Sequence, residues 1–503
     1  MNRLAYGDNL EIMRGMESES IDLIYLDPPF NSNRNYNFLY SQATGLPLPE
    51  EAEAFCDAWK LDVAKEETIR KMGEEMLQGG VNSEFIEFWK SWILALRNTN
   101  SKLLAYMVFM TERLVEMRRL LKPTGSIYLH CDPTASHYIK IIMDGIFGYD
   151  NFRNEIVWGY KTGGVSKRWF ARKHDILLCY AKKQDKKTYF IPQKYKSYQA
   201  KKYNYNEKYP EYFDEKENKW YHLSFMRDVW DDINPLGTGN KERLGYPTQK
   251  PLALLDRIIK ASCPENGVIL DPFCGCGTTV ISAQQNNRKW IGFDICLLAI
   301  NSVEDRLKNL FPSLKKGNDY RVDGLPVTVE QAITLAQSSN KTKTEGRFQF
   351  QYWAIEKVGG FASTKKSGDG GVDGSIYFYK DIEGKELGKM IASVKSDKKL
   401  VLDYIRALKG TLSNGAADMA GLICIDEPTE GMKAEALKAG FYEVDFGTMG
   451  KKSYQKVQIL TIKDIIENSK KFQTPFKIQK KIAEFTQNKN NQKDKPLLKN
   501  GLF

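Results

Sequence analysis

A short acidic turn near the N-terminus carries side chains that can do chemistry. In Asp27-Pro28-Pro29-Phe30, two prolines remove backbone donors and hold a carboxylate, a carbonyl and an aromatic ring in fixed positions. Asp27 and the Pro28 carbonyl can accept both hydrogens of an exocyclic amine, while Phe30 stacks on the ring that bears the amine. Taken alone, however, the tetrapeptide is more typical of a proline-stiffened turn.

A second acidic turn, Asp271-Pro272-Phe273-Cys274-Gly275-Cys276-Gly277-Thr278-Thr279, joins a predicted strand to a predicted helix. Its glycines allow a ligand to approach the backbone, and the helix N-terminus offers unpaired N–H groups. Asp271 would repel a pyrophosphate but attract an ammonium or sulfonium group, and S-adenosylmethionine carries both cations. Asp294 ends the next predicted strand 23 residues later, close to the spacing of about 20 at which an acid binds ribose hydroxyls. The two acids favour a cofactor site over a tight turn with packing glycines.

The elements that must position these turns alternate along the chain. Apolar runs predict strands at residues 20–27, 126–130, 268–271 and 289–294. Helical spacing of apolar residues predicts a helix over 106–121 and another from Thr278. Strands that alternate with helices predict an α/β fold with a mostly parallel, doubly wound sheet.

The composition of the 503 residues is that of a globular protein, with 42% hydrophobic and 27% charged residues, and the length predicts about three domains. We find neither a signal-like N-terminus nor a run of about 18 apolar residues, so membrane insertion and secretion are not expected. The eight cysteines show no paired Cys-x-x-Cys spacing, which predicts reduced thiols in a cytoplasmic protein.

The formal net charge of +11 arises from one segment, residues 161–210, which holds 14 Lys or Arg against three acids. Seven tyrosines lie among these cations, a combination that suits nucleic acid, although a solvated lysine-rich surface is commoner for a charge run taken alone. The candidate DNA contacts are Lys182, Lys183, Lys186, Lys187, Lys194, Lys196, Tyr198, Lys201, Lys202, Tyr203 and Tyr205.

The order of the two acidic turns resembles that of the β-class amino-group DNA methyltransferases, in which the catalytic half precedes the cofactor half. Further similarity lies in Gly7-Asp8-Asn9-Leu10, the position of the family's cofactor-adenine contact, and in Thr248-Gln249-Lys250-Pro251, which leads into the methionine pocket. Phe152 to Gly159 and Lys173-His174-Asp175 also match core segments of the family. The resemblance covers most of residues 1–310.

This resemblance implies a permuted Rossmann-like methyltransferase that moves a methyl group from S-adenosylmethionine to an amine of a base flipped out of double-stranded DNA. Asp27 before the two prolines favours adenine N6, and cytosine N4 is the alternative. The segment 181–246 takes the family's target-recognition position. A Rossmann-type oxidoreductase is the remote alternative, because it leaves the turn at Asp27 unexplained and sets Asp271 against a pyrophosphate.

Residues 345–467 resemble the Mrr-like branch of the PD-(D/E)xK restriction-endonuclease fold. The resemblance implies Asp373 as a ligand of Mg²⁺ and Lys395 as the catalytic lysine, but Ser393 stands where the family has Glu or Gln. Asp369 and Glu356 are candidates to compensate. Both a nuclease and an inactive module that only binds DNA or partners therefore stay open.

The resulting expectation is a restriction–modification protein, either a homodimer or associated with other subunits of such a system. Its predicted parts are a methyltransferase domain over 1–312 (catalytic half 1–180, target-recognition insert 181–246, cofactor half 247–312), a connector over 313–344, a nuclease-like domain over 345–467 and a basic, flexible tail over 468–503.

Overall fold

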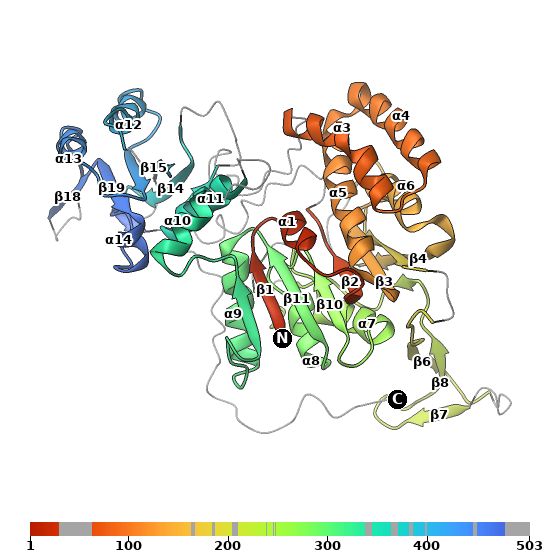
Figure 1. Cartoon of the computed structure of the whole chain (residues 1–503). Coiled ribbons are helices and arrows are strands. Elements are labelled where there is room, and N and C mark those ends of the chain that lie inside the picture. The colour runs from red at the N-terminus through yellow and green to blue at the C-terminus, as the bar shows by residue number, and fades with distance from the viewer. Residues whose placement is uncertain are drawn as a thin grey trace.

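A computed structural model of the chain is drawn in Figure 1. The residues that the structure describes are 1–29, 63–161, 166–183, 187–203, 210–237, 239–244, 246, 248–337, 345–363, 371–381, 386–397, 400–445 and 450–477.

A nine-stranded sheet forms the centre of the larger part of the molecule. In spatial order its strands are β12 (Tyr320–Asp323), β1 (Asn2–Tyr6), β11 (Lys289–Asp294), β10 (Val268–Asp271), β2 (Ile21–Leu26), β3 (Leu121–Cys131), β5 (His174–Ala181), β4 (Phe152–Gly159) and β9 (Val229–Trp230). The first six of these strands are mutually parallel, and β5 runs antiparallel to both of its neighbours. The predicted mostly parallel sheet is therefore confirmed.

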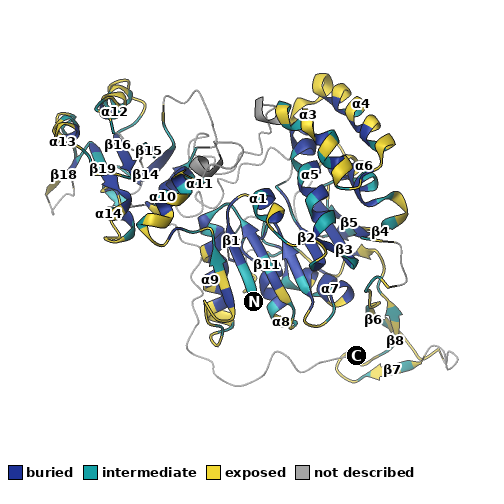
Figure 2. Cartoon of the chain, viewed as in Figure 1, coloured by how far each residue is buried: buried dark blue, intermediate teal, exposed yellow. Residues whose placement is uncertain are grey.

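Helices cover both faces of this sheet, so its central strands are buried on both sides and consist of nearly continuous apolar runs (Figure 2). Residues of α1, α3, α4, α5 and α6 belong to the core on one face, and residues of α7, α8 and α9 belong to the core on the other. Their bounds are α1 (Asn9–Arg14), α3 (Val63–Gln78), α4 (Ser83–Thr99), α5 (Ser101–Leu120), α6 (Ser136–Phe147), α7 (Leu252–Ser262), α8 (Thr278–Gln285) and α9 (Leu297–Leu310), with a short 3-10 helix η2 (Tyr149–Asn151) before β4.

The order of the strands interleaves the two ends of this region. β1 and β2 are consecutive in the sequence but are not neighbours, because β11 and β10 lie between them. β12 then pairs with β1 and adds the last strand of the sheet. The sheet thus extends to Asp323, past the boundary that the sequence places at residue 312, because the short polar strand Tyr-Arg-Val-Asp has no apolar pattern that reveals it.

A small antiparallel sheet lies within the segment 181–246, at the edge of the molecule beyond β4 and β9 (Figure 1). Its central strand is β8, and β9 follows β8 and pairs in parallel with β4, which attaches the small sheet to the large one. Its strands are β6 (Lys194–Gln199), β8 (Lys219–Phe225) and β7 (Glu211–Asp214).

The C-terminal part contains a second mixed sheet, in which the β14–β15 hairpin is followed by the parallel strands β16 and β19. Phe476 and Lys477 form a strand that pairs with β14, so the predicted flexible tail is ordered at its beginning, and residues 478–503 lie outside the described residues. The strands are β13 (Phe361–Ala362), β14 (Gly374–Tyr379), β15 (Leu387–Lys395), β16 (Met419–Cys424), β19 (Val457–Thr461) and β20 (Phe476–Lys477), with a separate pair β17 (Phe441–Asp445) and β18 (Lys451–Gln455).

The two parts share one apolar core rather than being joined by a free linker. Phe350 and Trp353 of α11 are buried in the same cluster as residues of β1, α9 and β14. α10 and α11 therefore form the bridge between the sheets. The helices of this part are α10 (Val329–Gln337), α11 (Glu345–Lys357), α12 (Asp403–Ser413), α13 (Glu430–Leu437) and α14 (Ile462–Ile466).

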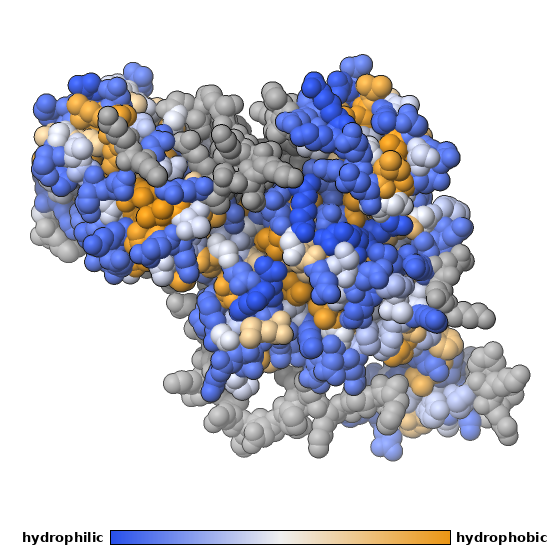
Figure 3. Space-filling model, viewed as in Figure 1, coloured by the Kyte–Doolittle hydropathy of each residue, from blue (hydrophilic) through white to orange (hydrophobic). Residues whose placement is uncertain are grey.

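The face shown in Figure 3 is mainly hydrophilic, and its hydrophobic residues form separate patches. Within the described ranges, no helix combines the length and the apolar character needed to cross a membrane.

Candidate active site

The two acidic turns meet at the carboxyl end of the large sheet. β2 and β10 are parallel neighbours, with Leu270 opposite Ile24, so Asp271 and Asp27 follow adjacent strands at the same edge. Ligands of open α/β sheets bind at this edge. One pocket is lined by both turns and by the segment around Lys250: Tyr25, Asp27, Tyr246, Thr248, Gln249, Lys250, Leu255, Asp271, Phe273, Cys274, Gly275, Cys276, Thr278 and Thr279.

Asp27 is paired with Lys250, a residue that the sequence places toward the methionine pocket. The Lys250 Nζ donates to Asp27 Oδ2 at 2.5 Å, and both side chains are largely buried. A buried carboxylate needs such a partner, because desolvation without one is costly. Pro28 and Pro29 follow directly, whereas Phe30 lies outside the described residues.

The glycine turn has the backbone conformation that only glycine adopts readily. Gly275 and Gly277 have φ values of +49° and +78°. A Cβ on Gly277 would lie 2.6 Å from Val303 Cγ2, so α9 packs directly on this turn. Thr278 and Thr279 are buried in the first turn of α8 and line the pocket, so the N-terminus of this helix lies at the pocket edge.

Asp271 is buried and Asp294 is partly buried, and burial raises the pKa of both carboxyls. Burial raises the pKa of Asp271 to about 7, against the opposing effect of hydrogen bonds from Thr279 and the Phe273 N–H. Burial also raises the pKa of Asp294 to about 6, although the Gly275 and Cys296 N–H groups donate to its two oxygens at 2.9 and 2.8 Å. A cationic ligand in this pocket, which Asp271 lines, would favour the charged form of that carboxyl.

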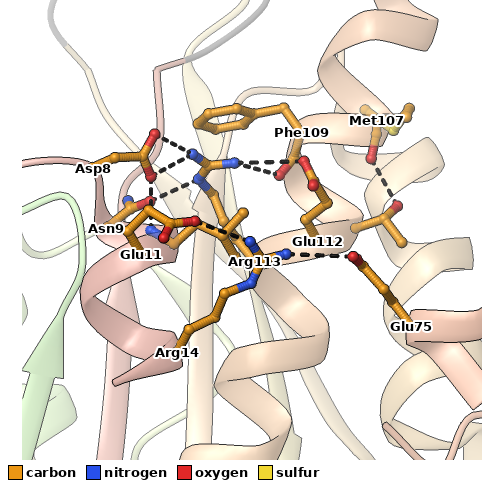
Figure 4. Close-up of polar contacts among 11 residues, drawn as sticks. Asp8, Asn9, Glu11, Arg14, Glu75, Met107, Phe109, Glu112 and Arg113 are labelled. Atoms are coloured by element: carbon orange, nitrogen blue, oxygen red, sulfur yellow. Dashed lines mark hydrogen bonds and ion pairs between the residues drawn. The ribbon is translucent and has the colours of Figure 1, made fainter. Parts of the chain in front are cut away.

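Arg113 of α5 holds the turn that carries Asp8 and Asn9 (Figure 4). Its Nη2 donates to both Asp8 oxygens at 2.9 and 3.1 Å, and its Nε donates to Asn9 Oδ1 at 2.7 Å. Asp8 also accepts from the Leu10 N–H at the start of α1, and Asn9 Nδ2 donates to the Pro272 carbonyl at 2.7 Å. The expected cofactor contacts Asp8 and Asn9 are thus tied to the glycine turn.

Sequence reasoning missed Arg113, although one signal was present. Arg113 lies three residues after Met110 and four before Met117, so it occupies the apolar stripe of the predicted helix 106–121. A charged residue on such a stripe is buried only with partners. Its guanidinium also lies over the Phe109 ring, 3.5 Å from the centroid.

A buried hydrogen-bond chain beneath the pocket was also missed. The Tyr25 hydroxyl and His130 Nδ1 are 3.0 Å apart, and His130 Nε2 and Asp175 Oδ2 are 3.1 Å apart. Burial acts to raise the pKa of Asp175, but the His130 and Tyr160 hydrogen bonds and the charge of Lys250 hold it below its ordinary value. An ionised Asp175 accepts from His130 Nε2–H, which leaves His130 Nδ1 to accept from Tyr25.

The basic segment divides into lysines with structural partners and lysines on the small sheet. The Lys182 ammonium donates to the Arg118 and Leu121 carbonyls, and burial lowers its pKa to about 8. Lys196 Nζ and the Tyr198 hydroxyl both donate to Asp214 Oδ2, at 2.7 and 2.9 Å. Three side chains that the sequence assigns to DNA contact thus use their polar groups for hydrogen bonds within the protein. They are Lys182, Lys196 and Tyr198.

The remaining candidates of this segment that the structure describes are exposed. Lys194, Lys201 and Lys202 lie over the rings of Phe225, Tyr203 and Trp220, with their Nζ atoms 4.9, 5.6 and 4.9 Å from the ring centroids. Lys183, Lys187 and Tyr203 are also exposed, and Lys186 and Tyr205 lie outside the described residues.

The residues expected for a nuclease make contacts within the C-terminal sheet. Asp373 Oδ2 accepts from the Val394 N–H at 2.6 Å and from the buried Ser393 Oγ at 3.2 Å. The Lys395 Nζ lies 5.1 Å from the centre of the Tyr404 ring. Among the described residues, no group of three or more His, Cys, Asp or Glu side chains could hold a metal ion.

Of the two candidates for a compensating ligand, only Glu356 lies within the described residues. Glu356 accepts a hydrogen bond from the Leu297 N–H at the start of α9, and Asp369 lies outside the described residues.

A doubly wound sheet with a glycine turn and a second acidic turn at the ends of adjacent parallel strands is typical of an α/β domain that binds a nucleotide-like cofactor. The chain belongs to the N6/N4 DNA methylase family, whose sequence model matches residues 21–304. S-adenosylmethionine is the cofactor, and the chemistry of the buried Asp271 and the partly buried Asp294 beside the glycine turn fits its cationic and ribose groups.

Individual proteins are similar to parts of this chain. Type II methyltransferase M.HpaI of Haemophilus parainfluenzae is 27% identical over 319 residues, which cover 61% of this chain and 75% of that protein. DNA adenine methyltransferase YhdJ of Escherichia coli (strain K12) is 25% identical over 297 residues, 58% of this chain and 78% of that protein. Among solved structures, PvuII DNA methyltransferase (cytosine-N4-specific) has 14% identity and a TM-score of 0.36, and the match covers 61% of this chain and 86% of that one.

Proposed function

We propose that this DNA methyltransferase is specific for adenine N6 within a defined DNA sequence. The observation that carries the proposal is the position of Asp27, followed by two prolines, one strand away from Asp271. An aspartate at this place suits an amine that needs a strong acceptor. The alternative is cytosine N4, because the family includes enzymes of both specificities.

Asp27 and the Pro28 carbonyl are the acceptors for the two hydrogens of the target amine. Their hydrogen bonds draw the nitrogen lone pair out of conjugation with the ring and toward the methyl group. Because Asp27 already accepts from Lys250, the ammonium compensates the carboxylate charge while the amine uses the remaining lone pairs. The base must leave the duplex to reach this pocket, at a cost of a few kcal/mol.

The cofactor lies beside Asp271 and the glycine turn, which line the pocket, and beside Asp294, which accepts from the Gly275 N–H of that turn. Bound S-adenosylmethionine supplies an activated methyl group on a sulfonium. We assign Asp271 to the cationic methionine end and Asp294 to the ribose hydroxyls, since Asp294 ends the strand next to the glycine turn. Asp8, Asn9 and Leu10 support the adenine side through the turn that Arg113 holds.

The small sheet of β6, β7 and β8 is assigned to target recognition. Exposed Lys194, Lys201 and Lys202 combine positive charge with neighbouring aromatic rings, which suits contact with DNA phosphates. Lys182 and Lys196 instead support the fold around this surface.

For the C-terminal part, the contacts of Asp373 favour a module that does not cleave DNA over a nuclease. Its carboxylate is used by the Val394 backbone and Ser393, which leaves no acidic cluster among the described residues. We assign no step to Mg²⁺.

Sequencing of host DNA with detection of modified bases tests the methyltransferase proposal directly. The chain and an Asp27→Ala control are expressed in a host that lacks DNA methylation. N6-methyladenine at one recurring sequence, absent in the control, is the expected result. N4-methylcytosine would overturn the adenine assignment, and unmodified DNA from folded protein would overturn the proposed activity.

A further inference from the structure

The bridging helix α11 contacts the cofactor edge of the large sheet through Glu356. Its Oε2 accepts a hydrogen bond from the Leu297 N–H at 2.7 Å. Leu297 is the first residue of α9, and the preceding Cys296 provides no side-chain cap for that helix. Glu356 therefore caps α9 from another helix, where a carboxylate also has the charge that a helix N-terminus favours.

This cap fixes the turn that carries Asp294. At the start of the turn, the Asp294 carboxylate accepts from the Gly275 and Cys296 N–H groups. At its end, the Leu297 N–H is held by Glu356. The backbone from Asp294 to Leu297 is thus anchored at one end by the glycine turn and at the other by the C-terminal part of the chain.

The same helix also contacts the neighbouring cofactor turn. Gln349 Nε2 donates to the Tyr6 carbonyl at 3.1 Å, and the Gly7 N–H donates to the Asp294 carbonyl at 3.0 Å. Gly7 has φ of +145°, and a Cβ there would lie 2.5 Å from Gln349 Nε2. The absence of a side chain at Gly7 is what admits Gln349, so the two parts are fitted to each other at this edge.

We propose that Glu356 is a positioning residue of the S-adenosylmethionine site, supplied by the helix that bridges to the C-terminal part. It holds the Asp294 turn in the geometry that receives the ribose, so cofactor affinity depends on the docking of α11. The inference rests on the proposed roles of Asp294 and Asp271 in binding the cofactor. It gives the C-terminal part a function in methylation itself, independent of any activity of its own.

Calorimetric titration of S-adenosylmethionine into the full chain tests this proposal. Glu356→Ala removes the acceptor and is expected to raise the Kd about 5- to 20-fold, less than the roughly 10- to 150-fold that a hydrogen bond to a charged group is worth, because the effect reaches the cofactor only through the Asp294 turn. Glu356→Gln keeps a side-chain oxygen at the same distance from the backbone, so its Kd for S-adenosylmethionine is expected to stay within about threefold of the wild-type value. Lys357→Ala is the matched control, because Lys357 is the exposed neighbour on the same helix.

A kinetic measurement separates positioning from general damage to the fold. Glu356→Ala should raise the KM for the cofactor while kcat at saturating cofactor and the KM for DNA stay near the wild-type values. Where the alanine variant does not fold, Glu356→Asp replaces it, since the shorter side chain no longer reaches Leu297. Gln349→Ala should act in the same direction.

The outcomes distinguish this inference from the function on which it rests. Wild-type affinity in the Glu356 variants, together with weakened affinity in Asp294→Ala, would overturn the role of Glu356 and leave the cofactor site intact. Wild-type affinity in both Asp294→Ala and Asp271→Ala would overturn the proposed cofactor site, and the inference with it.

Discussion

Lys250 and Asp27, 223 residues apart in the sequence, form a buried ion pair with 2.5 Å between Nζ and Oδ2. The pair joins the turn after β2 to the segment before α7, so the turn of Asp27 is held by the half of the domain that carries the glycine turn. A target amine therefore meets a carboxylate that already has one donor. The two residues are therefore expected to contribute to activity in different ways. Asp27 accepts from the amine, and Lys250 compensates the charge of Asp27.

Asp27→Ala should lower the rate of methyl transfer by at least about 100-fold, the effect expected when a preorganised contact worth roughly 3 kcal/mol is removed. Affinity for S-adenosylmethionine should change little, because the carboxylate polarises the amine and does not hold the cofactor. Single-turnover assays and calorimetry measure the two quantities. Turnover at the wild-type rate in the folded variant would refute the assignment of Asp27.

Cofactor binding should strengthen as the pH rises from about 5.5 to 7.5. The pKa of Asp271 is about 7 and that of Asp294 is about 6 in the free protein. The cation of the cofactor favours the ionised form of Asp271, and hydrogen bonds from the ribose hydroxyls favour that of Asp294. Binding near pH 6.5 should therefore release protons, and affinity should level off above the higher pKa. Calorimetry in two buffers of different ionisation enthalpy measures the proton release. A flat affinity across this range would contradict the prediction, and Asp271→Asn should remove most of the slope.

Arg113→Ala should destabilise the domain by about 2 kcal/mol, less than the full cost of breaking a buried ion pair because Asp8 is half exposed. Arg14→Ala is the matched control, since Arg14 forms partly exposed pairs with Glu11 and Glu75 in the same region (Figure 4) and should cost about 0.5 kcal/mol or less. Urea denaturation measures both changes. Equal effects of the two variants would show that Arg113 has no special role in the turn of Asp8.

Replacing Lys194, Lys201 and Lys202 by Gln should flatten the dependence of log DNA affinity on log salt by about 0.9 for each lysine that binds a phosphate. Lys182→Gln should leave the slope unchanged and lower stability instead, because the Lys182 ammonium donates to backbone carbonyls. DNA titrations at several salt concentrations measure the slopes. An unaltered slope in the triple variant would mean that the small sheet is a solvated surface that does not bind the DNA backbone.

Asp373→Ala should destabilise the C-terminal sheet by about 1–3 kcal/mol, because the buried Val394 N–H and Ser393 hydroxyl lose their acceptor. The same hydrogen bonds predict that Mg²⁺ does not raise the melting temperature of the wild type. Thermal melts with and without Mg²⁺ check both points. Stabilisation by Mg²⁺ that disappears in Asp373→Ala would restore the nuclease interpretation.

Patterns within short segments could be predicted from the sequence, whereas contacts between distant segments could not. The turns at Asp27 and Asp271 and the strands before them follow from local apolar runs, prolines and glycines, and all four predicted strands are present. The partners of Arg113 and Glu356 lie about 100 and 60 residues away in the sequence, and no local pattern reveals them.

Charge composition also fails to distinguish a phosphate-binding lysine from a structural one. Lys182 and Lys202 belong to the same basic run, yet one ammonium donates to main-chain carbonyls and the other lies over the Trp220 ring. The difference depends on how deeply each lysine side chain is buried. The net charge of the segment carries no information about that burial.

The interleaving of β1 and β2 with β11 and β10 also determines when this protein can fold during synthesis. Once residue 26 has left the ribosome, the edges of both early strands lack the neighbours that residues 268–294 later provide. At usual elongation rates that delay is roughly 12 to 50 s. The nascent chain must therefore keep two apolar strand edges from pairing with other chains during this interval, and we expect its yield to depend on chaperones that cover them.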